Sequence, residues 1–171
     1  MNQHRAVHQA ASLLLNYPDQ RWPAHRALVL ESIGGLSGPA TESLRRFCRR
    51  TADVPLLDLA AQYVTTFDRS RRRTLHLTHY TDGDTRDGGA SLAALRARYR
   101  QYGWEPSGGE PPDHLPAVLE FAARCPAAGR AVLHDHRGAL ALLAAGLAAE
   151  GSPYLDVIRA VRATLDEGVR L

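Results

Sequence analysis

The stretch PLLDLAAQYVTTF, Pro55 to Phe67, has the clearest periodicity in the 171-residue sequence. Its apolar residues recur at intervals of three and four, which places them on one face of an α-helix. Pro55 suits the first helical turn because its missing N–H would have no partner there, and Asp53 is positioned to cap that turn. The stretch predicts an amphipathic helix whose buried face carries Leu56, Leu59, Ala60, Tyr63, Val64 and Phe67.

Similar apolar spacing recurs along most of the chain. It predicts further helices near residues 7–15, 22–33, 39–51, 92–102, 115–125, 127–150 and 154–165. TLHLTHY, Thr74 to Tyr80, fits a short strand or a short helix equally well, and no other segment alternates clearly enough to indicate a strand. We therefore expect residues 1–171 to form a single all-α domain, a bundle of about eight helices.

The most apolar segment is ALALLAAGLAA, Ala139 to Ala149, which is apolar nearly all round. It is shorter than the roughly 20 residues that span a bilayer, so it is interpreted as a central core helix and no membrane insertion is expected. The N-terminal residues lack a cationic region followed by a continuous apolar stretch. That pattern predicts no secretory signal and a cytoplasmic protein.

The basic charge of the chain is mild and is carried entirely by arginine. The sequence has 21 arginines, no lysine and 18 acidic residues, giving a net charge of +3 and a pI near 9.2. Only RSRRR, Arg69 to Arg73, is locally dense. Single-stranded nucleic acid would need exposed aromatic side chains for stacking, whereas Tyr63 and Phe67 lie on the predicted buried face. We expect a solvated loop and no nucleic-acid partner, and keep an arginine-mediated regulator as the alternative.

The stretch YTDGDTRDGG, Tyr80 to Gly89, invites comparison with a calcium-binding loop. Counted from Asp82, the fifth position is Arg86 and the twelfth is Ala93, where an EF-hand needs an oxygen ligand and a bidentate glutamate. A capped connection between helices is therefore the better interpretation, with Asp84 or Thr85 as the cap.

Histidine pairs occur at residues 4 and 8, 76 and 79, and 134 and 136, but no HExxH motif accompanies them. The two cysteines, Cys48 and Cys125, indicate neither a disulfide framework nor a zinc site. Signatures of serine hydrolases, P-loop proteins and Rossmann folds are also missing from the sequence. We expect no enzyme, no cofactor and no metal, with a histidine-dependent metalloenzyme as a weaker alternative.

A different kind of signal comes from EPPDHLPAVLEF, Glu110 to Phe121. Asp113 and His114 stand where a stiff, proline-rich loop becomes a helix, whose first N–H groups lack helical partners. Asp113 is predicted to cap this helix, and His114 to project into an adjacent groove.

Five stretches, spread over nearly the whole chain, share features with one known family: LLLNYPDQ, YVTTFD, GDTRDGG, PDHLPAVLEF and LHDHRGALALLAAGLAAEGSPY. The sequence resembles, on these residues, the delta-chain chaperones of respiratory nitrate reductase, the NarJ branch of the TorD-like maturation family. The family motif of an aromatic residue, two spacers, leucine and phenylalanine corresponds to residues 63–67, with Thr66 departing from leucine. The glutamate, proline, aspartate and histidine motif corresponds to Glu110, Pro111 or Pro112, Asp113 and His114.

The resemblance implies an all-helical, TorD-like chaperone rather than an oxidoreductase. It implies binding to the N-terminal segment of the apo nitrate reductase catalytic (alpha) subunit, support of molybdenum cofactor insertion and a delay of membrane docking. Molybdenum cofactor biosynthesis proteins are a further implied partner. The peptide would bind in an apolar groove with a polar end, and the expected site comprises Tyr63, Phe67, Asp84, Arg86, Glu110, Pro112, Asp113, His114 and Leu115.

Overall fold

The computed structural model describes residues 2–83 and 89–166, and this part of the chain is all-α, as expected. Ten α-helices follow one another in this described part of the chain: α1 (Asn2–Leu14), α2 (Trp22–Ile33), α3 (Pro39–Thr51), α4 (Leu56–Tyr63), α5 (His79–Asp82), α6 (Ala90–Gln101), α7 (Leu115–Arg124), α8 (Pro126–Asp135), α9 (Arg137–Ala149) and α10 (Leu155–Asp166). A π-helical turn, η1 (Val64–Asp68), and two 3₁₀ turns, η2 (Arg71–Arg73) and η4 (Ser107–Gly109), lie between them.

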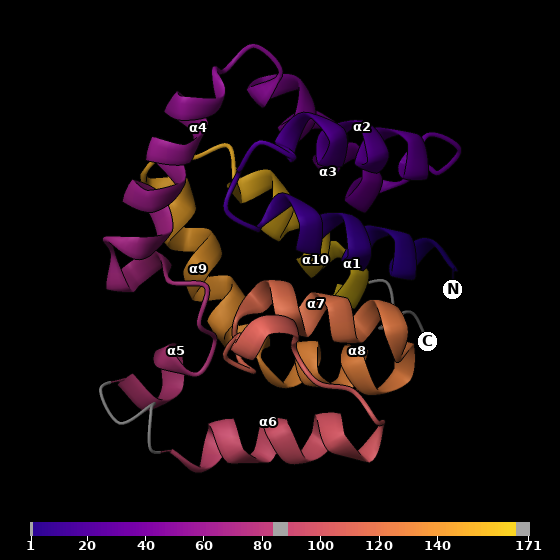
Figure 1. Ribbon diagram of the computed structural model, residues 1–171, viewed down its shortest axis with the longest axis vertical. Helices are drawn as coiled ribbons and strands as arrows, with labels where there is room; N and C mark the ends of the chain where they lie inside the picture. The colour runs from indigo at the N-terminus through magenta and orange to yellow at the C-terminus, as the bar shows by residue number, and fades with distance from the viewer. Residues whose placement is uncertain (1, 84–88, 167–171) are drawn as a thin grey trace.

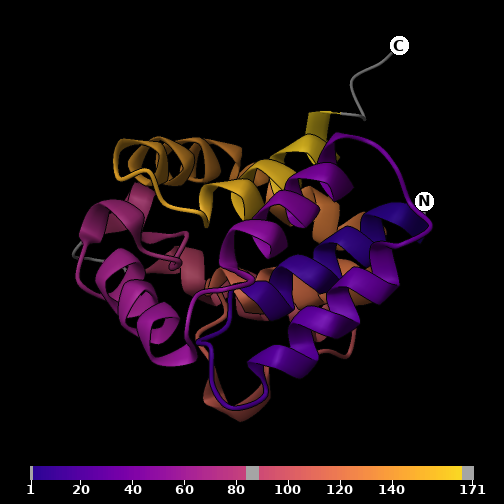
Figure 2. The ribbon, with the colours of Figure 1, turned by 90° about the horizontal axis from the view of Figure 1, so that it is seen from above.

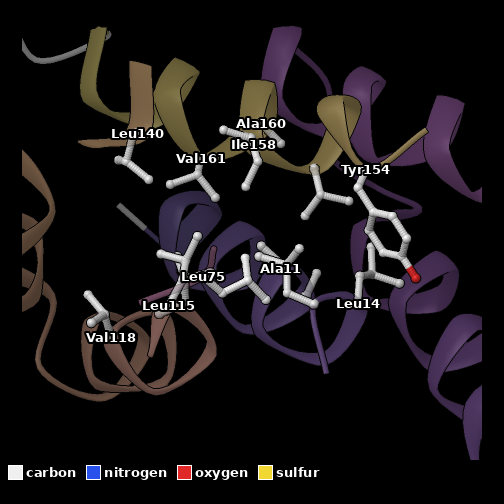
Figure 3. Close-up of a cluster of buried hydrophobic side chains, with 14 of the residues drawn as sticks. Ala11, Leu14, Leu75, Leu115, Val118, Leu140, Tyr154, Ile158, Ala160 and Val161 are labelled. Atoms are coloured by element: carbon white, nitrogen blue, oxygen red, sulfur yellow. The ribbon is translucent and has the colours of Figure 1, made fainter. Parts of the chain in front are cut away.

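Helix α1 forms the centre of the core, between α7 and α10, and α3 packs against α10 (Figure 1). Ala11 and Leu14 of α1 lie on the side of that helix that faces α10, with Ala11 below Ile158, and Leu115 of α7 lies below Val161 (Figure 3). All five side chains are fully buried. The three-and-four spacing of apolar residues thus produces the expected result, since it lets each helix turn one face to its neighbours.

The predicted helix over residues 55–67 is present, but it is divided. Helix α4 begins at Leu56, and Pro55 precedes it without any side-chain cap, so the expected cap by Asp53 is wrong. At its end the chain widens into η1, where the Arg69 N–H donates to the Val64 carbonyl at 3.1 Å, five residues back. Such π-turns are rare and often occur at functional sites.

The segment predicted as one alanine-rich helix over residues 127–150 is two helices, because the chain bends at His136 between α8 and α9. This break and the short α5 raise the number of helices above the predicted eight. Helix α9 is also not central, and Figure 2 shows it on the outside of the molecule. Its Leu140, Leu143 and Leu147 are buried, whereas Leu142 is 57% exposed. Within residues 2–83 and 89–166, no helix is long and apolar enough to cross a membrane.

Candidate functional site

The site is organised by a short pairing of two extended segments, residues 75–77 and 113–115. The Leu77 N–H donates to the Asp113 carbonyl at 3.0 Å, and the Leu115 N–H donates to the Leu75 carbonyl at 2.9 Å. These bonds flank an antiparallel bridge between His76 and His114. Directly opposed residues of this kind bring their side chains together. The two imidazole rings accordingly lie 5.1 Å apart between centroids.

This pairing explains the ambiguous run TLHLTHY. Leu75 and Leu77 are buried at 3% and 0% exposure, and His76 between them points to the partly exposed side. The run therefore begins as a strand-like segment and ends in α5. The histidine that lies opposite His76 is His114, which is far from it in the sequence.

Carboxylates contact both imidazoles. His114 Nδ1 hydrogen-bonds to Glu110 Oε1, and His76 Nδ1 lies 3.5 Å from Asp113 Oδ1. The side chains of His114 and Glu110 are 21% and 24% exposed, so a binding partner can reach both. The arrangement offers hydrogen-bond donors and acceptors at one rim, which suits it to orienting a polar group of a peptide.

Asp113 does not cap α7 as predicted. The residue before the helix is His114, and no side chain caps that end. Asp113 is fully buried and accepts hydrogen bonds from the Thr78 N–H at 3.1 Å and the Thr78 hydroxyl at 2.6 Å. The pairing of residues 75–77 with 113–115 brings Thr78 within reach, and its two donors hold the carboxylate away from the helix end.

Pro112 and Leu115 are buried and support the turn, and Pro112 also lines a small pocket beside Glu110. The Tyr99 hydroxyl donates to the Pro112 carbonyl at 2.6 Å, and Leu115 is fully buried. The Tyr99 ring packs at 4.7 Å from Phe121 and 4.8 Å from Trp104. Burial, followed by the nearby charges of Asp113 and Glu110, raises the pKa of Tyr99 above its usual range, so its hydroxyl remains a donor.

Tyr63 and Phe67 lie in the core. They are 5% and 4% exposed, and their rings lie 5.8 and 5.0 Å from the ring of Tyr154. The Tyr63 hydroxyl donates to the Leu15 carbonyl at 2.7 Å. Burial, and then the charges of Asp68 and Glu110, raises the pKa of Tyr63 above its usual range, so its hydroxyl remains a donor. At this exposure the two rings offer almost no surface to a bound peptide.

Of the other predicted site residues, Asp84 and Arg86 lie outside the described residues. The structure thus brings Glu110, Pro112, Asp113, His114 and Leu115 together on one turn, adds His76 to them, and places the two aromatic residues below the surface.

A groove that the sequence did not indicate lies between η2, α5 and α9. Its volume is about 610 Å³. The lining residues are Arg71, Arg72, Arg73, His79, Tyr80, Leu142, Ala145, Gly146, Ala149 and Glu150. A Cβ atom on Gly146 would stand 3.0 Å from the Arg72 carbonyl oxygen, so glycine here permits the close approach of η2 to α9. The sequence signals at this place were the arginine cluster RSRRR, which was interpreted as a solvated loop, and the apolar character of α9 on every side.

The turn and the groove are connected through residues 76–80. Thr78 holds Asp113 by two hydrogen bonds, and the next two residues, His79 and Tyr80, line the groove. The Tyr80 hydroxyl donates to the Thr74 carbonyl at 2.7 Å, which closes this short segment on itself. Asp113 therefore acts as a positioning residue for one wall of the groove.

The other histidines form no comparable site. His4 and His8 have ring centroids 6.3 Å apart, and within residues 2–83 and 89–166 no three His, Cys, Asp or Glu side chains gather to hold a metal ion. His8 is buried, and its Nε2 lies 2.9 Å from Thr164 Oγ1. Because the Thr164 hydroxyl donates to the Val161 carbonyl, His8 must be the donor in this pair.

Comparison with known proteins places the chain in a defined group. Residues 35–160 match the family model described as nitrate reductase delta subunit. A Bacillus subtilis protein named as a nitrate reductase molybdenum cofactor assembly chaperone, NarJ, is 34% identical over 94% of this chain and 89% of its own length. The Escherichia coli K12 protein of that name is 36% identical over 84% of this chain and 62% of its own.

A nitrate reductase-like protein of Mycobacterium tuberculosis, NarX, is 40% identical over 94% of this chain. The chain spans only 24% of the length of that relative. Among solved structures, an Archaeoglobus fulgidus protein described as a redox enzyme maturation protein superposes with a TM-score of 0.70. The match covers 95% of this chain and 93% of the other at 23% identity, and it supports the all-helical fold.

Proposed function

Because the chain belongs to the nitrate reductase delta subunit family, we propose that it is an assembly chaperone of nitrate reductase, and not itself an enzyme. It would bind the N-terminal segment of the apo catalytic (alpha) subunit in the cytoplasm, support insertion of the molybdenum cofactor and delay membrane docking. The observation that carries this proposal is the match of 94% of the chain to a protein named as such a chaperone.

The geometry of the site supports a binding role. Glu110 and His114 offer a partly exposed polar rim beside His76, and the described surface also contains an apolar groove on α9. An amphipathic helix uses such features together, because its apolar face enters a groove and a few polar contacts fix its orientation. Proteins that synthesise or deliver the molybdenum cofactor are a further proposed partner, since the cofactor must reach the bound apoenzyme.

The direct test is calorimetric titration of the chain with a peptide from the N-terminus of the cognate catalytic subunit. We expect saturable binding with one peptide per chain. Co-expression of the catalytic subunit with and without the chain provides the functional readout. We expect cofactor-loaded, active nitrate reductase only when the chain is present. A peptide that does not bind, together with full activity in the absence of the chain, contradicts the proposal.

The contribution of the polar turn is tested by His114→Ala and Glu110→Gln. Both side chains are about a quarter exposed, so we expect the fold to persist and the peptide affinity to fall by roughly 1–3 kcal/mol for each lost contact to a charged group. His134→Ala, an exposed histidine on α8, is the matched control and should bind the peptide normally. Equal affinity in all three variants would exclude the turn from the binding site.

A further inference from the structure

We propose that the groove between η2, α5 and α9 binds an amphipathic helix whose apolar face is flanked by acidic side chains. This inference rests on the proposed function in one respect, namely that the natural helix is the segment of the catalytic subunit that the chaperone holds. The chemistry of the groove itself stands on the residues that line it.

The floor of the groove is an apolar stripe on α9. Leu142, Ala145 and Ala149 are exposed and follow one another at three and four residues, so they share one face of the helix. The opposite face of α9, with Leu140, Leu143 and Leu147, is buried in the core. An exposed leucine alone would be unremarkable, but here it stands in a hollow of about 610 Å³ with alanines beside it.

The rim of the groove is positively charged. Its described lining residues include three arginines but a single carboxylate, Glu150. Arg73 Nη1 pairs with that carboxylate at 3.2 Å, and Arg73 Nε donates to the Thr66 carbonyl at 3.0 Å. Arg71 and Arg72 are both exposed. Acidic side chains on a docked helix would meet Arg72, and complementary charge of this kind sets partner choice and association rate.

The groove is held in shape before any partner arrives. The Arg72 N–H donates to the Ser70 hydroxyl oxygen at 3.3 Å, which fixes the start of η2. Gly146 lets η2 lie directly on α9, and Asp113 anchors the segment that leads to His79 and Tyr80. A preformed site loses less conformational entropy when it binds, which favours affinity.

An aliphatic floor favours a peptide helix over a nucleic acid. Single strands are bound by stacking bases on aromatic side chains above a basic groove. In the described lining, Tyr80 and His79 are the only rings, and the Tyr80 hydroxyl is hydrogen-bonded to the Thr74 carbonyl. Leu142, Ala145 and Ala149 instead offer the kind of surface that an amphipathic helix covers.

The charge preference is tested with two fluorescent peptides of about 16 residues, roughly four helical turns. Both carry the same leucine and alanine stripe, and their flanking positions are all glutamate in one and all lysine in the other. By fluorescence anisotropy, we expect the glutamate peptide to bind at least about tenfold more tightly, with a difference that shrinks as salt is added. Equal binding, or tighter binding of the lysine peptide, would overturn the inference.

The location is tested with charge-introducing variants. Leu142→Glu should weaken binding of the glutamate peptide at least about tenfold, because it adds a repulsive charge to an apolar contact. Leu28→Glu, at a similarly exposed leucine of α2, is the matched control and should bind within about twofold of wild type. Arg72→Glu should shift the preference towards the lysine peptide, whereas Arg21→Glu, on the loop before α2, should not. Circular dichroism checks that all four variants are folded.

The same variants separate this inference from the proposed function. If the catalytic-subunit peptide binds wild type and Leu142→Glu equally, the groove is wrong as its docking site and the chaperone function stands. If that peptide fails to bind wild type but the glutamate probe binds and depends on Leu142, the groove stands and the chaperone function falls. A single-stranded oligonucleotide that binds through Arg72 but not Leu142, with neither peptide binding, overturns the inference in favour of nucleic acid.

Discussion

The aromatic pair Tyr63 and Phe67 and the groove on α9 contrast in exposure and chemistry. Tyr63 and Phe67 carry a family motif, yet they are almost fully buried and pack against Tyr154. The groove carries no motif predicted to bind a peptide, yet it combines exposed Leu142 with exposed arginines. The contrast shows that residues typical of a family can be buried in its core, whereas the surface that we propose for binding is formed by other residues.

The turn from Glu110 to Leu115 contains both buried and accessible residues. Asp113 and Leu115 are fully buried, whereas Glu110 and His114 remain accessible. Its buried members hold residues 75–78 in place, and of its accessible members His114 faces His76 and Glu110 hydrogen-bonds to His114. Substitutions in the buried set should therefore change stability, and substitutions in the accessible set should change binding.

The largest effect is expected from Phe67→Ala. Removing this buried ring, which contacts Tyr63 and Tyr154, should lower the free energy of unfolding by about 3–5 kcal/mol. The control Leu57→Ala removes a side chain that is 84% exposed and should change it by less than about 0.5 kcal/mol. Urea denaturation followed by circular dichroism measures both. Similar stabilities would mean that Phe67 is not a core residue and is available as a groove wall.

Asp113→Ala should have the next largest effect. It deprives the Thr78 N–H and hydroxyl of their buried acceptor, at a cost of about 3 kcal/mol in unfolding free energy. Asp113→Asn retains one acceptor oxygen and should cost about half as much. Chemical denaturation of the two variants beside Glu110→Gln gives the comparison. If Glu110→Gln proved as destabilising as Asp113→Ala, the division of the turn into buried and accessible sets would fail.

Another buried residue, His8, should make the stability of the fold depend on pH. Burial, with added repulsion from His4 and Arg130, lowers the pKa of His8 from 6.5 to about 4. Between pH 6.5 and 4, His8 is therefore protonated in the unfolded chain but not in the native state. The free energy of unfolding that is present above about pH 6.5 is lost as the pH falls towards 4. Between pH 7 and pH 5 the loss should be about 2 kcal/mol.

His8→Gln isolates this contribution, because its amide can still donate to Thr164 Oγ1 and does not titrate. Denaturation curves at pH 7 and pH 5 should show a smaller loss for the variant than for wild type by about 2 kcal/mol. Parallel losses in the two proteins would show that His8 can be protonated in the native state.

Tyr63→Phe should have the smallest effect. It keeps the ring contacts and leaves the Leu15 carbonyl without its hydroxyl donor, which should cost about 1 kcal/mol. Tyr17→Phe, at a ring that is 53% exposed and packs on Tyr63, should be nearly neutral. Thermal unfolding of the two variants beside wild type measures this difference in stability. A Tyr63→Phe variant with normal stability but weakened peptide binding would indicate that this hydroxyl contacts the peptide.

Local patterns predicted most of the helices, since apolar spacing depends only on nearby residues. They did not reveal the pairing of His76 with His114, because it joins segments 38 residues apart through backbone hydrogen bonds. The cap assigned to Asp113 failed for the same reason, since Thr78 reaches it only after this pairing. The prediction that α9 is a central helix was wrong, because alanine and leucine on every side of a helix do not reveal which face remains exposed.

The central claim, that this chain holds a segment of the catalytic subunit in the α9 groove, is tested most directly by hydrogen–deuterium exchange with and without the N-terminal peptide. We expect slower exchange in residues 71–80 and 142–150 when the peptide is bound, and no change in α2. Protection confined to α2 and α3, or binding with no protection at α9, would contradict the claim.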